Sequence, residues 1–152
     1  MLLSRSFFIF LTFIFCLVDR PASAGWQFLE QNQYGDVYVD PQTIVRSGSL
    51  AKMWSAYIYK WPMKMIESGV VKNAKEYLSQ KKLTEFDCYN KTLRVLEKIN
   101  FSQKSLNGEM VAHLVADYTT GLARLIDGFS WQKMDKFTDD SDPALWSFVC
   151  KK

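Results

Sequence analysis

Histidine, cysteine and long apolar runs are scarce in this chain of 152 residues. It has one histidine, three cysteines and no Cys-x-x-Cys pair, so a cysteine and histidine zinc site lacks its ligands. The lone histidine, His113, lies in an apolar stretch, and no Gly-x-Ser-x-Gly turn occurs that would indicate a serine hydrolase. We therefore interpret His113 as a structural or surface residue and expect no catalytic residue, metal or cofactor.

A strong charge of one sign is also missing. The chain carries 19 Lys and Arg against 16 Asp and Glu, a formal net charge of +3. Without Arg5, Arg20 and Asp19 of the first 24 residues, 17 basic and 15 acidic side chains remain, a net charge of +2. Such a balance does not indicate nucleic acid as a partner.

The longest apolar run lies at the N-terminus, over residues 7–18, and is shorter than the ~20 residues that a membrane span needs. Arg5 precedes the run, Pro21 follows it, and Ala22-Ser23-Ala24 is the small-x-small pattern of a signal-peptidase site. We predict a signal peptide over residues 1–24, a domain over 25–152 and no membrane span after cleavage. An uncleaved anchor is the alternative. A lipid anchor is not indicated, because Phe15 precedes Cys16 where lipoprotein processing requires a small residue.

Cleavage leaves two cysteines, Cys88 and Cys150. An even pair in an oxidising compartment normally forms a disulfide, and closing a loop of roughly sixty residues stabilises a fold by about 4 kcal/mol in the chain-entropy model. The alternative is a pair of free or metal-bound thiols. We predict the disulfide.

Alternating side chains and turn residues predict an α+β fold, an antiparallel sheet of five or six strands with a C-terminal helix tethered by the disulfide. Ser47-Gly48-Ser49 indicates a hairpin turn, and Asp142-Pro143 is typical of a helix start. The candidate strand segments are 26–30, 37–39, 43–46, 50–61, 77–88, 93–101 and 109–118, the last with a helix as the alternative. Residues 62–74 are expected to be a loop with one or two helical turns, and 119–137 stay ambiguous, with a strand or a helical turn as options.

Two alternations matter for the surface. In 50–61 both faces carry aromatic residues, so the pattern does not decide which face is buried. In 93–101 the pattern places Leu93, Val95, Glu97, Ile99 and Phe101 together on one face, against Arg94, Leu96 and Lys98 on the other.

A basic and aromatic surface is the candidate binding face. If strands 77–88 and 93–101 pair, several of these side chains are expected to share an exposed face able to dock acidic protein segments or glycans. The alternative is a solvated edge that discourages aggregation. The candidate residues are Lys81, Lys82, Lys91, Arg94, Tyr77 and Tyr89.

Carboxylates supply the competing enzymatic hypothesis. Glu85 or Asp87 facing Glu97 or Asp117 across a cleft would be a possible glycosidase pair. Three further carboxylates near the C-terminal helix are interpreted as helix caps, with calcium binding as the alternative: Asp139, Asp140 and Asp142.

Several patches resemble the surface-adhesin protein E family of bacterial envelope proteins. They are YVDPQTIVRSG at 38–48, KMWSAY at 52–57, EFDC at 85–88 together with Arg94, and WSFVC at 146–150. The resemblance implies a small antiparallel sheet with a disulfide-tethered helix and, for the founding members, adhesion to host matrix proteins.

We therefore expect an exported, non-enzymatic binding module of the bacterial envelope, in the periplasm, at the cell surface or secreted, with a protein or glycan partner. A small secreted enzyme using dispersed carboxylates and a periplasmic structural module are the alternatives. Monomer and dimer both stay open.

Overall fold

The computed structural model describes residues 25–64, 75–116, 132–133 and 142–151. The predicted signal peptide, residues 65–74 of the expected loop, nearly all of 119–137, and Asp117, Asp139 and Asp140 lie outside these ranges. The elements are β1 (Gln27–Gln31), β2 (Gly35–Val39), the 3-10 turn η1 (Pro41–Thr43), β3 (Val45–Ser47), β4 (Leu50–Lys64), β5 (Glu76–Asp87), β6 (Thr92–Phe101), β7 (Met110–Val115), β8 (Gln132–Lys133) and α1 (Asp142–Cys150).

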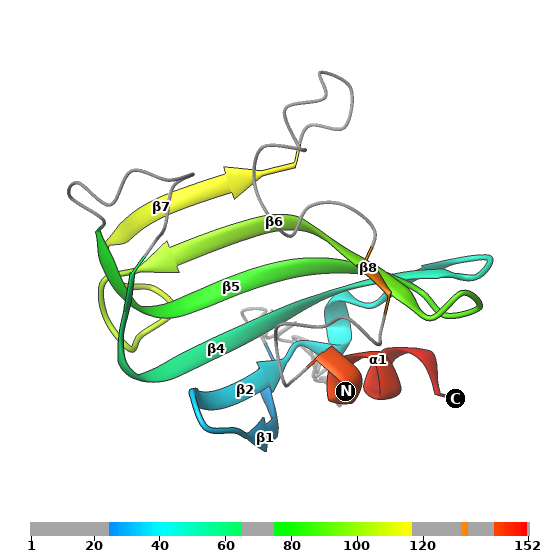
Figure 1. Ribbon diagram of the computed structural model, residues 1–152, viewed down its shortest axis with the longest axis horizontal. Helices are drawn as coiled ribbons and strands as arrows, with labels where there is room; N and C mark the ends of the chain where they lie inside the picture. Colours follow the sequence, from blue (N-terminus) through cyan, green and yellow to red (C-terminus); the bar gives the residue numbers. More distant parts are fainter. Residues whose placement is uncertain (1–24, 65–74, 117–131, 134–141, 152) are drawn as a thin grey trace, which may run out of the picture.

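Within the described residues the strands form one antiparallel sheet in the order β1-β2-β4-β5-β6-β7, with β3 beside β4 and β8 beside β6 (Figure 1). α1 contacts β1, β4 and β5. The predicted α+β architecture with a C-terminal helix is confirmed. Six strands form the main path, and the other two are short additions.

The core lies between α1 and one face of the sheet. Leu145 and Val149 of α1 are fully buried in one cluster with Val37, Met53 and Phe86 of the strands. The structure thereby settles the inward face of β4, since Met53, Ser55, Tyr57 and Tyr59 lie on it and the indole of Trp54 does not. We call the sheet face that carries α1 the helix face, and the other the opposite face.

The predicted disulfide joins Cys88, directly after β5, to Cys150, the last residue of α1, with 5.3 Å between their Cα atoms. The amide of Cys88 also donates to the carbonyl of Ser49 at 2.9 Å in the turn between β3 and β4. A helix of nine residues is marginal alone. The bond therefore fixes the end of α1 to the end of the sheet.

The structure corrects one predicted boundary and decides one open alternative among the strands. β4 continues through Pro62 to Lys64, because its last residues pair with Glu76 and Tyr77 of β5, so the expected loop does not begin at residue 62. Residues 110–115 form a strand, not the alternative helix, because they pair with β6.

The alternation predicted for 93–101 is wrong beyond Val95. A bulge places Thr84 opposite Val95 but Leu83 opposite Glu97, so Leu96 is an extra residue in β6. Glu97, Ile99 and Phe101 therefore share the opposite face, while Leu93 and Val95 lie on the helix face.

Candidate functional site

Lys82 does not belong to an exposed binding face. It pairs with Ser55 in the sheet register, which places it on the helix face, and it is only 5% exposed. Its Nζ lies 3.4 Å from Oδ1 of Asp142 at the start of α1 and 4.7 Å from the ring centroid of Tyr57. This buried ion pair joins the middle of β5 to the helix, so the expected exposure of Lys82 is corrected.

The predicted aromatic residues also lie apart. Tyr77 is half-buried and packs edge-to-face on Tyr59, with ring centroids 5.6 Å apart, beside the core cluster. Tyr89 is 84% exposed in the turn between β5 and β6, where Lys91 adopts a φ of 54°. Tyr77 is thus at the beginning of β5, and Tyr89 with Lys91 lies beyond its end.

Asp87 organises that turn. Its carboxylate accepts from the backbone amides of Tyr89 and Asn90, each at 3.0 Å, and from the side chain of Asn90 at 2.7 Å. These hydrogen bonds, those from Asn90 first, lower the pKa of Asp87 below 3.8 because they favour the ionised carboxylate. Asp87 is therefore occupied by the turn.

Arg94 and Lys81 are the two predicted residues that reach the opposite face. Arg94 donates from Nε to Oε2 of the buried Glu85 at 2.6 Å. Between β6 and β7, Oε1 of Glu97 lies 2.7 Å from Nε2 of His113. The carboxylates of the enzymatic hypothesis are thus each engaged by a basic side chain or a turn, apart from Asp117, which lies outside the described part of the chain.

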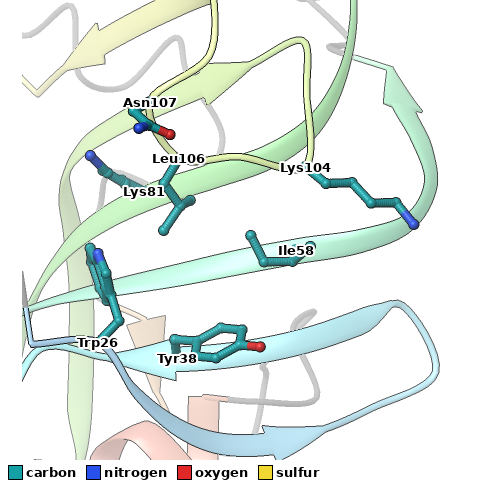
Figure 2. Close-up of a pocket in the computed structure, with 7 residues that line it drawn as sticks. All are labelled: Trp26, Tyr38, Ile58, Lys81, Lys104, Leu106 and Asn107. Atoms are coloured by element: carbon teal, nitrogen blue, oxygen red, sulfur yellow. The ribbon is translucent and has the colours of Figure 1, made fainter.

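Lys81 lines a pocket on the opposite face, whose volume of about 480 Å³ is within the usual size range of ligand sites. Figure 2 shows its lining, which comes from five separate segments: the residue before β1, the strands β2, β4 and β5, and the loop between β6 and β7. Trp26, Tyr38, Ile58 and Leu106 supply the apolar and aromatic part, and Lys81, Lys104 and Asn107 supply the polar part.

The strands position the floor of this pocket. Tyr38 pairs with Ala56, which pairs with Lys81, so these three side chains form a row across β2, β4 and β5. Tyr38 also packs edge-to-face on Phe28, with 5.7 Å between centroids, and Phe28 is 53% exposed. The pocket therefore adjoins an aromatic pair in which Tyr38 is half-buried and Phe28 is exposed.

The loop between β6 and β7 provides the wall. The hydroxyl of the fully buried Ser79 donates to the carbonyl of Gln103 at 2.7 Å, and the carbonyl of Ser105, at 3.3 Å, shares the same proton. The amide of Ser102 donates to the carbonyl of Glu109 at 2.9 Å, which closes the base of the loop. These bonds hold Lys104, Leu106 and Asn107 over the sheet (Figure 2).

The charge of the pocket is positive. Lys81 Nζ lies 5.3 Å from the ring centroid of Phe101, a cation–π contact. Among the described residues, neither Lys81 nor Lys104 has a carboxylate within 4.0 Å. Two ammonium groups thus line an aromatic hollow without an ion-pair partner in that part of the chain.

Sequence reasoning found Lys81 but not the other lining residues. The pocket depends on a loop that folds back over the sheet and on the segment before β1, which lies beside it. Neither arrangement follows from local sequence patterns. One signal was present: neighbouring residues of a strand point to opposite faces, so Lys81 and Lys82 were never able to share one.

The architecture defines a class of small domains in which one antiparallel sheet carries a terminal helix fixed by a disulfide. The family model of surface-adhesin protein E matches residues 26–151. The chain belongs to this family, as its sequence patches predicted.

A solved structure of Haemophilus influenzae protein E has the same fold. Its crystal form II superimposes with a TM-score of 0.50 at 10% identity, covering 84% of this chain and 87% of that one. Its selenomethionine form gives a TM-score of 0.48 at 8% identity, covering 81% and 84%. A search of curated proteins gave no match. Within the described residues, no helix has the length and apolar character needed to cross a membrane.

Proposed function

We propose that this chain is an exported, non-enzymatic binding module that holds another macromolecule on the opposite face of its sheet, with host matrix proteins as the first partners to test. The observation that carries the proposal is the positive, aromatic pocket around Lys81, in a member of a surface-adhesin family. Lys104 and Trp26 lie at its rim in the same view (Figure 2).

Export is part of the proposal. Residues 1–24 have the features of a cleavable signal peptide, with cleavage after Ala24. The disulfide between Cys88 and Cys150 supports the same compartment, because such bonds persist in oxidising environments outside the cytosol. Gly25 would then be the first residue of the mature protein, directly before Trp26.

Binding is favoured over catalysis because two carboxylates on this face are paired with basic side chains. A general acid or base needs a carboxylate free to exchange a proton with the substrate. Glu85 is held by Arg94 and Glu97 by His113, on the same face as the pocket. Neither lines the hollow, which offers amines, an amide and aromatic rings instead.

The test is saturation binding of the mature chain, residues 25–152 with a C-terminal tag, to a panel of purified extracellular-matrix proteins. We expect saturable binding that untagged protein displaces. The double variant Lys81→Glu with Lys104→Glu should weaken it by about tenfold or more, as charge reversal in a contact surface does. Lys91→Glu changes an exposed lysine at the far end of β6 and is the matched control.

The proposal would be contradicted if binding to every matrix protein rose linearly with concentration and untagged protein did not displace it. Equal losses of affinity in the pocket variant and the control variant would contradict it as well. Protease treatment of intact and of permeabilised cells separates the alternatives of location. Cleavage on intact cells supports adhesion, whereas cleavage only after permeabilisation favours a periplasmic structural module.

A further inference from the structure

We propose that the pocket recognises an acidic glycan, through anionic groups held by Lys81 and Lys104 and a sugar ring packed on Trp26 and Tyr38. This inference rests on the proposed function and names the chemistry of its partner. The observations behind it are the charge of the pocket, its aromatic lining and its location on the face of the sheet.

Location decides between a glycan and an extended peptide. A peptide that binds as an added strand needs the free amides and carbonyls of a sheet edge. The pocket instead lies over β2, β4 and β5, interior strands whose backbone groups bond to neighbouring strands. Recognition there depends on side chains. A peptide lying across this face would leave its own backbone groups without those partners, which costs free energy when they lose water.

Charge selects an acidic ligand. Lys81 and Lys104 come from different segments, a strand and a loop, and their ammonium groups lie on opposite sides of the hollow (Figure 2). Two anionic groups spaced along a chain would therefore meet one ammonium each. Lys81 is half-buried and held over Phe101, so part of its ordering cost is already met in the free protein. Within the described residues no carboxylate competes with a ligand for either amine.

The remaining lining fits a sugar. A pyranose ring has apolar faces of C–H groups and a polar rim, which matches aromatic rings that combine an apolar body with a polar tip. Trp26 and Tyr38 supply such rings, and the amide of Asn107 supplies both a donor and an acceptor for hydroxyl groups. The volume of about 480 Å³ accommodates a short segment, not a long chain.

The test measures binding of a heparin-derived hexasaccharide to mature protein tagged at the C-terminus, so that the amine of Gly25 beside Trp26 is free. Maltohexaose is the neutral probe and hexaglutamate the acidic peptide probe. We expect saturable binding of the heparin fragment alone. Lys104→Gln, in the exposed loop, should weaken it about fivefold, and adding Lys81→Gln about tenfold further, whereas Lys91→Gln should change it by less than about twofold.

Trp26→Leu separates a built site from attraction to any basic surface. It leaves the charge unchanged, and we expect it to weaken binding by about fivefold through lost aromatic packing. Equal binding of hexaglutamate, an effect of Lys91→Gln as large as that of Lys104→Gln, or an unchanged affinity in Trp26→Leu would each overturn the glycan assignment.

The proposed function fails separately. If matrix proteins still bind after enzymatic removal of their acidic glycans while the heparin fragment does not bind, this inference is wrong and the binding module stands. If removal of those glycans abolishes matrix binding, the inference is supported.

Discussion

Replacing Lys82 by Met should destabilise the protein by about 3 kcal/mol without weakening ligand binding. The change leaves Asp142, whose side chain is 6% exposed, as a buried carboxylate without this partner. Breaking a buried ion pair in this way costs about 3–5 kcal/mol. At 3.4 Å and an effective dielectric constant of about 20, the Coulomb attraction of the pair is about 5 kcal/mol before desolvation is subtracted. The N-terminus of α1 also favours a negative Asp142, which places the expected loss at the lower end of the range.

The assay is urea unfolding followed by far-ultraviolet circular dichroism for the wild type, Lys82→Met, Asp142→Asn and the double variant. The loss in free energy of unfolding in the double variant should be smaller than the sum of the losses in the two single variants, because the pair is removed as a unit. A loss below about 0.5 kcal/mol in Lys82→Met, or strict additivity, would refute the role assigned to the pair. The same variant, still folded, should bind matrix proteins as the wild type does, because Lys82 faces away from the pocket.

Three further outcomes are expected. Gly35→Ala should lower the free energy of unfolding in urea by about 3 kcal/mol, since its Cβ would clash with the carbonyl oxygen of Ile58, and a loss under about 1 kcal/mol would show that the strands can separate. Replacing Cys88 and Cys150 by Ser opens a loop with a sequence separation of 62 and should cost about 4 kcal/mol, measured against the wild type under oxidising conditions; equal stability would contradict the tethering role. Asp87→Ala should lower stability near neutral pH, because a carboxylate whose pKa is lowered in the fold contributes stability above its unfolded pKa of 3.8. The stability difference between wild type and variant should shrink as pH falls through the folded pKa. A stability difference that is constant with pH would contradict the role assigned to Asp87.

Much of the fold was predictable because its signals are local. The Ser47-Gly48-Ser49 turn lies between two pairing strands, with Gly48 at a φ of 59°, as a tight hairpin requires. The pairing of the two cysteines followed from their number and the expected compartment, and the helix start from Asp142 and Pro143. Each of these inferences used neighbouring residues or a simple count.

The candidate site was less predictable because it depends on side chains brought together from distant segments. The bulge at Leu96 moves Ile99 and Phe101 to the opposite face, and no local pattern marks that residue. The hydrogen bonds from Ser79 fold the loop over the sheet, so Lys104 became visible only in three dimensions. The sequence pattern predicts a strand at Trp26, next to the predicted cleavage point, and indicates no binding role for it.

The most direct test of the opposite face as the binding surface is chemical-shift mapping by nuclear magnetic resonance on labelled mature protein with increasing heparin-derived hexasaccharide. The account predicts saturable shifts at the indole N–H of Trp26, the amides of Lys81 and of residues 104–107, with little change at Tyr89 and Lys91. Shifts centred on the turn at 88–91, or absent at saturating concentration, would contradict it.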